Sequence, residues 1–188
     1  GLGPKSIAIV ASTLSKAGVE RMDVLGNPMG DSVELLIDIF LKTERIRTMC
    51  GIEEGTVSLD LSKRNMDPSN VRLLAVELNS SRATAGVVRV DISGNGISGA
   101  RFRSDGSARA GVDSDLSGVT ALSEALPTSK IVELLISKCG LGPKSIAIVA
   151  STLATAGVEA VDLSNNRFDP SLLDSIKHKV KLNLTGCA

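Results

Sequence analysis

A short template recurs along the chain and constrains its fold more than any other feature. Each copy begins with an apolar residue, a middle residue that is usually Asp, and a second apolar residue, followed by a turn. This alternation, with a period of two, is typical of a short β-strand whose alternate side chains enter a core. The sequence therefore predicts six strand segments, whose first core positions are Met22, Leu59, Val90, Leu134, Val161 and Leu182.

A second pattern, with helical spacing, lies between these segments. Apolar residues recur at i, i+3, i+4 and i+7, which places one apolar stripe along each amphipathic helix. The stripes of the five expected helices begin at Ile7, Val33, Val71, Val119 and Ile146. Proline is tolerated at the first helical position and aspartate is a good N-cap, so both mark helix starts. Such signals occur at Pro4, Pro68, Pro143 and Pro170, with Asp67 and Asp169 before two of them.

Strand and helix recur together about every 27 residues, and one stretch, GLGPKSIAIVASTL, occurs unchanged at 1–14 and at 140–153. Periods of this size are typical of repeat architectures, in which each unit buries its apolar face only against its neighbours. The 188 residues are too few for two comfortable domains. We therefore expect a single repeat array over 1–188.

The repeat resembles the leucine-rich repeats, in particular the subclass with one strand and one full helix per unit found in ribonuclease inhibitor, Ran GTPase-activating protein and NOD-like receptors. The family template reads L-x-L-x-x-N/C-x-L, and a donor at its N/C position can bond backbone carbonyls of neighbouring units. The resemblance implies an α/β solenoid in a horseshoe arc, with parallel strands on the concave face and helices on the convex face. The N/C positions are Asn27, Asn95, Cys139, Asn166 and Cys187, whereas Arg64 departs from the pattern.

Composition and charge narrow the class of protein. Lys plus Arg and Asp plus Glu both number 21, so the chain lacks the basic excess expected of a nucleic-acid binder. No apolar run reaches the roughly 18 residues that span a bilayer, and the first residues do not form a signal peptide. Three widely spaced cysteines fit a reducing compartment better than a disulfide framework. We expect a cytoplasmic protein that contacts neither nucleic acid nor membrane.

Few residues suit catalysis or cofactor binding. The formal G-x-G-x-x-G at 94–99 is not followed at once by a helix whose N–H groups could face a pyrophosphate. The single histidine, His178, and the absence of a Cys-x-x-Cys pair give metal ions little to bind. The sequence therefore predicts no catalytic residue, no cofactor and no metal site.

One column of residues is a candidate partner-binding surface. The residue between the two core positions of each strand points to the opposite face, and strands lie roughly 5 Å apart. Carboxylates in that column would form an acidic stripe able to attract a basic or hydrogen-bonding partner. Asp is also common at this position in the leucine-rich repeats that the chain resembles. The aspartates are therefore equally well explained as a feature of that family, without any contact to a partner. The column consists of Asp23, Asp60, Asp91, Leu135, Asp162 and Asn183.

Two insertions interrupt the repeat, at 48–56 and at 100–116. In repeat arrays such additions map to loops on one edge, which is often a binding edge. The Gly, Ser and Asp content of the second insertion favours the alternative of a flexible solvated loop. Its candidate contact residues are Arg101, Phe102, Arg103 and Arg109.

Three functions remain open at this point. The leading hypothesis is a non-enzymatic scaffold that binds a protein partner through the concave face, with the second insertion as a further contact. The resemblance to the Ran activator implies a GTPase-activating protein as the alternative, with an arginine such as Arg103 stabilising charge on the transferred phosphoryl group. Loss of GTPase acceleration in Arg103→Ala would distinguish the two. A purely structural array is the third possibility.

The two ends of the array lack partners in the repeat pattern. A helix without a preceding strand comes first, and a strand without a following helix comes last. Stable arrays usually carry polar caps at their ends. We therefore predict that the chain is a fragment of a longer array or that its ends associate, the last strand accepting the first helix of another copy.

Overall fold

The computed structural model describes residues 2–14, 16–103 and 108–187. It is an α/β protein in which five short strands of the described residues form one parallel sheet, ordered β1-β2-β5-β6-β7. A second, two-stranded sheet pairs β3 with β4. The parallel strands are β1 (Ser58–Asp60), β2 (Arg89–Asp91), β5 (Glu133–Leu135), β6 (Ala160–Asp162) and β7 (Lys181–Asn183).

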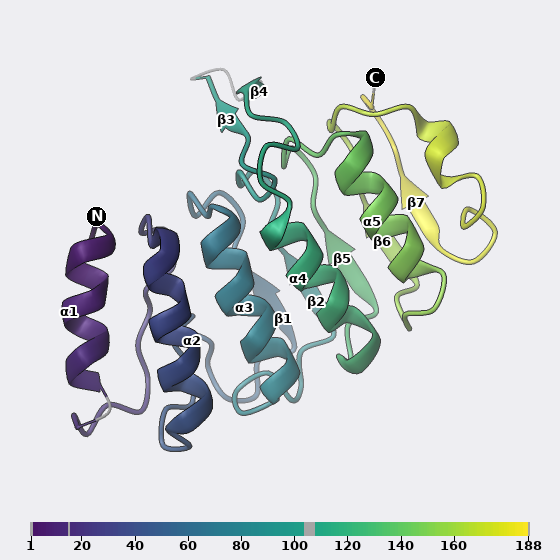
Figure 1. The fold of residues 1–188 in the computed structure, drawn as a ribbon. Coiled ribbons are helices and arrows are strands. Elements are labelled where there is room, and N and C mark those ends of the chain that lie inside the picture. The colour runs from purple at the N-terminus through teal and green to yellow at the C-terminus, as the bar shows by residue number, and fades with distance from the viewer. Residues whose placement is uncertain (1, 15, 104–107, 188) are drawn as a thin grey trace.

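The five expected helices are present, and they lie side by side in chain order (Figure 1). They are α1 (Pro4–Leu14), α2 (Val33–Lys42), α3 (Pro68–Ser80), α4 (Ser117–Ala125) and α5 (Pro143–Leu153). Each packs against the next one along the chain. Short 3₁₀ segments occur at η1 (Gly30–Ser32), η2 (Leu126–Thr128) and η3 (Pro170–Leu173). No helix in the described ranges combines the length and apolar content needed to cross a membrane.

The helix-start signals act as the sequence indicates. Pro4, Pro68 and Pro143 each occupy the first helical residue, where a missing N–H breaks no hydrogen bond. Asp67 caps α3 by accepting the backbone N–H of Asn70 at 3.1 Å. Pro170 begins η3, which is a 3₁₀ segment of four residues, so the last unit described contains no full helix after its strand.

The core lies between the sheet and the row of helices. The central residues of the five strands stand opposite one another in register, and the first four are buried. The helices turn their apolar stripes to the same interior, because each stripe has the period of the helix. The predicted ladder therefore holds for Leu59, Val90, Leu134, Val161 and Leu182.

The sixth predicted strand segment, at Met22, does not join this ladder. Isolated bridges pair Arg21 with Thr48 and Asp23 with Cys50, and the N–H of Met22 donates to the carbonyl of Thr48. The first insertion folds back beside the Met22 segment because the buried carboxylate of Glu77, on α3, accepts hydrogen bonds from 48–50. The prediction of six equivalent strands is thus wrong at its first member.

The second insertion contains an antiparallel hairpin of β3 (Arg101–Phe102) and β4 (Ala108–Ala110). Residues 101–102 and 108–110 are therefore paired strands rather than the flexible loop that the composition of this insertion favours. Asp113, just beyond β4, accepts backbone N–H groups at the start of α5, which ties the hairpin to the body of the protein. Residues 104–107 and the side chain of Arg109 lie outside the described part of the chain.

Candidate interaction surface

The sheet turns one face to the helices and the other away from them (Figure 1). The residues that alternate with the buried core row form two rows on the outer face, held in register by the parallel pairing. All of them are exposed or half-buried. We call this set the open face: Ser58, Asp60, Arg89, Asp91, Glu133, Leu135, Ala160, Asp162, Lys181 and Asn183.

The aspartates of the open face close the turns that follow their strands. The Oδ1 atoms of Asp60, Asp91 and Asp162 each accept the backbone N–H two residues later, at 2.9 Å. Such a bond replaces a backbone turn bond and explains why Asp suits this position. The hydrogen bond from the Ser62 N–H lowers the pKa of Asp60, which keeps that carboxylate charged. The turn occupies one oxygen of each carboxylate.

Carboxylates outnumber cations on the open face. Arg89 is engaged by its neighbours, since its Nε lies 3.2 Å from Glu133 Oε2 and its Nη1 donates to Ser58 Oγ at 3.3 Å. Lys181 is the other cation of the set. Asp60 and Asp162, on either side of this ion pair, therefore offer negative charge to a partner.

The open face is hollowed over β5, β6 and β7. The hollow has a volume of about 250 Å³, and its lining includes Glu133, Leu135, Ala160, Asp162 and Lys181. Ala160 is small and stands between Glu133 and Lys181 in the strand register, which leaves room for an incoming side chain. The hollow thus combines an apolar base with a charged rim, which is the composition of protein–protein contact centres.

Asp23 lies apart from this row. Its Oδ2 is 2.6 Å from Nη2 of Arg64, the residue that departs from the N/C pattern. The buried side chain of Asn70 accepts the Gly26 N–H at 2.7 Å and donates to the Asn27 carbonyl at 3.0 Å. The repeat template does not identify Asn70, although an amide within the first turn of an apolar-striped helix is a recognisable signal.

The asparagines at the N/C positions join successive units. The side chain of Asn95 donates to the carbonyls of Leu61 and Ile92, at 2.9 and 2.8 Å. Asn166 donates to the carbonyls of Ile136 and Leu163, both at 2.8 Å. Asn27 donates to the carbonyl of Val24 in its own unit at 2.9 Å, and its Oδ1 accepts the N–H of Leu2, from the unit before, at 2.7 Å. These bonds pair carbonyls that strand ends would otherwise leave without donors.

The cysteines at the N/C positions make weaker bonds of the same kind. The Cys139 thiol donates to the Ile92 carbonyl at 3.4 Å, and the Cys187 thiol to the Leu163 carbonyl at 3.2 Å. Burial raises the pKa of Cys139 to about 12, so this group stays a protonated donor. Among the described residues, no group of three His, Cys, Asp or Glu side chains is placed to hold a metal ion.

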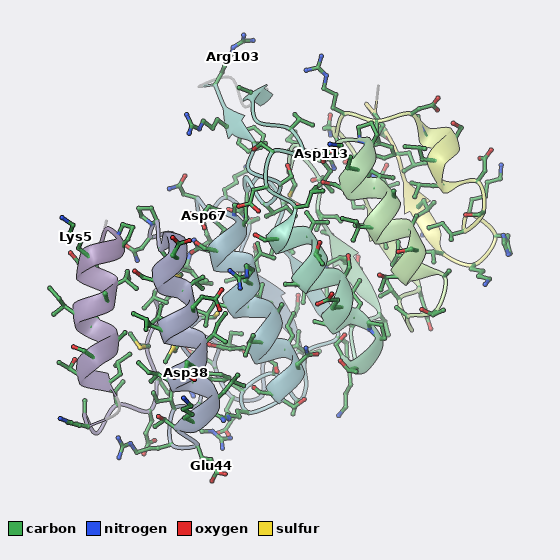
Figure 2. The ribbon with its side chains drawn as sticks, viewed as in Figure 1. Lys5, Asp38, Glu44, Asp67, Arg103 and Asp113 are labelled. Atoms are coloured by element: carbon green, nitrogen blue, oxygen red, sulfur yellow. The ribbon has the colours of Figure 1, made fainter. Side chains whose placement is uncertain are left out.

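The hairpin residues form a separate surface. Arg101 and Phe102 line a hollow of about 520 Å³ together with Asp67 and Pro68. Arg103 is exposed and points away from the body of the protein (Figure 2). This hollow shares no lining residue with the one on the open face, so the hairpin candidates and the aspartate column do not form one site.

Neither a scan against protein-family models nor a search of curated proteins found a match to the chain. The evidence on function therefore comes from the side chains of the open face and the hollow between them.

Proposed function

We propose that the chain is a leucine-rich repeat solenoid, with parallel strands on its concave face and helices on its convex face. Two observations support this proposal. The five strands pair in the order of the sequence, and the side chains of Asn95 and Asn166 join each unit to the one before it. In such an array each unit is stabilised by its neighbours, and the strand face stays open for recognition.

We propose that the open face binds, without catalysis, a protein partner that carries a basic side chain next to an apolar one. The hollow at Leu135 and Ala160 is the observation that carries the proposal, because it offers an apolar seat beside the carboxylate of Asp162. A buried anchor surrounded by a polar rim is the arrangement that concentrates binding energy in known interfaces. Asp60 would attract the same partner at longer range.

Site-specific photo-crosslinking tests this proposal. A benzophenone amino acid at Leu135 is expected to capture a discrete protein from cells, whereas the same group at the exposed Leu35 of α2 is not. The purified partner should then bind the wild type, and Ala160→Arg should weaken binding at least tenfold by filling the hollow. Equal capture from both positions, or unchanged affinity in Ala160→Arg, would contradict binding at the open face.

A further inference from the structure

The strand register fixes the spacing of the groups that a partner meets on the open face. One row consists of Asp60, Asp91, Leu135 and Asp162, on β1, β2, β5 and β6, and each is the register partner of the next. Neighbouring parallel strands lie about 4.8 Å apart. Along this row Leu135 is therefore about 10 Å from Asp60, and Asp162 is about 14 Å from it.

Arg89 divides the carboxylates of the open face into paired and unpaired ones. Its Nη2 lies 3.8 Å from Asp91 Oδ2, and its Nε lies 3.2 Å from Glu133 Oε2. The Asp91 side chain is also only 17% exposed. Among the described residues, neither Asp60 nor Asp162 takes part in a salt bridge. The row thus offers unpaired negative charge at its two ends and apolar surface between them.

An α-helix lying across the strands matches this spacing. Its residues i, i+7 and i+11 share one face, and their heights along the axis are 0, about 10.5 and about 16.5 Å. These heights fall within about 2 Å of the places of Asp60, Leu135 and Asp162, a difference that the long side chains of Lys and Arg accommodate.

An extended strand crossing the same row does not match it. The side chains on one face of a strand recur about every 6.8 Å. When one of them lies over Asp60, the next two lie at about 6.8 and 13.6 Å, so the second reaches Asp162 but neither lies over Leu135. A helix therefore uses all three groups of the row, whereas a strand uses two.

We propose that the partner presents an α-helix across the open face, with Lys or Arg at i and i+11 and a large apolar residue at i+7. The basic residues pair with Asp60 and Asp162, and the apolar one lies in the hollow at Leu135 and Ala160. The helix begins over β1, because its positive N-terminal end then lies near Asp60 and its negative C-terminal end near Lys181. This inference rests on the proposed function, since it takes the open face as the binding surface.

NMR titration of the protein with synthetic helices tests the proposal. The probe is an alanine-rich and glutamine-rich peptide of about 18 residues, with Arg at i and i+11 and Leu at i+7. In the control peptide the Leu is moved to i+5, on another face of the helix. The probe should shift the amide signals of Ala160 and Asp162 and bind roughly tenfold more tightly than the control, because only the probe buries its Leu. Ala160→Arg should abolish this difference. Equal binding of both peptides, or no binding of either at millimolar concentration, would overturn the proposal.

Paired substitutions test the direction of the helix. Asp60→Asn removes the charge and keeps the hydrogen bond of the turn, because an Asn side chain also accepts an N–H two residues later. It should weaken the probe about threefold and leave a peptide with Gln at i unaffected. Asp162→Asn should have the same relation to the Arg at i+11. Coupling of Asp60 to i+11 instead, or no coupling at either position, would overturn the proposed pairing.

Failure of this inference is distinguishable from failure of the proposed function. Photo-crosslinking at Leu135 reports whether any protein binds the open face, whatever its structure. Discrete capture there, combined with equal binding of the two peptides, would reject the helix and retain the open face as a binding surface. Loss of both results would reject the proposed function as well.

Discussion

A single buried amide can hold two units together, and Asn166 is the clearest case. Its side chain donates two hydrogen bonds to carbonyls and accepts the N–H groups of Cys139 and Leu141, at 3.0 and 3.1 Å. Asn166→Ala leaves three backbone groups without partners, because the Leu163 carbonyl still accepts the Cys187 thiol. We expect the free energy of unfolding to fall by about 3 kcal/mol, measured by urea denaturation.

Asn79 supplies the control for this prediction. It is exposed and accepts one hydrogen bond, from Thr128 Oγ1 at 2.6 Å. Asn79→Ala should therefore change the free energy of unfolding by less than about 0.5 kcal/mol. If Asn166→Ala destabilised the protein no more than Asn79→Ala does, the hydrogen bonds of Asn166 would contribute little to stability.

Glu77 makes stability depend on pH. Burial raises its pKa above the ordinary value of 4.5, although the hydrogen bonds from Met49, Thr48 and Cys50 lower it in part. Between 4.5 and the raised pKa the folded state binds more protons than the unfolded state, so stability falls as pH rises through that window. Glu77→Gln should remove this slope, as measured by urea denaturation at a series of pH values. It should also lower stability at neutral pH, because an amide accepts fewer N–H groups than a carboxylate does. A slope that persists in Glu77→Gln would assign the pH dependence to another group.

At the scale of elements, the two identical helices should differ in local stability. Helix α5 is covered on both sides and capped by Asp113, whereas α1 is covered on one side. We expect amide hydrogen exchange to be at least tenfold faster in α1 than at equivalent positions of α5, in dilute solution. Asp113→Asn should speed exchange in the first turns of α5 and leave α1 unchanged. Equal rates in the two copies would show that helix sequence, rather than its neighbours, sets local stability.

The elements also show how far sequence reasoning reaches. Period and spacing predicted the five helices and five of the six strand positions, because both depend on local alternation of apolar residues. They failed at Met22, because a contact from α3 determines what the Met22 segment pairs with. Glu77 accepts hydrogen bonds from Thr48 and Cys50, which holds the first insertion beside that segment. No local pattern around Met22 contains that information.

The candidate site was predictable to a similar degree. The middle position of each strand identified Asp60, Asp91 and Asp162 as residues of one face, since their order follows from the repeat. The hollow was not predictable, because it depends on which small side chain lies between two larger ones on neighbouring strands. Ala160 has that place only through its register with Glu133 and Lys181. The hairpin was missed because its Gly-rich and Ser-rich sequence carries no strand alternation.

At the scale of the whole molecule, stability should decline from the middle of the sheet toward its edges. Each unit buries its apolar residues against two neighbours in the middle and against one at an edge. The N–H of Ile92, bonded to the Leu135 carbonyl, lies in the middle, and the N–H of Leu163, bonded to the Asn183 carbonyl, lies beside the edge strand β7. In dilute solution we expect Leu163 to exchange at least tenfold faster, equivalent to about 1.4 kcal/mol of opening free energy. Equal exchange at both positions in dilute solution would instead mean that the sheet opens as one cooperative unit.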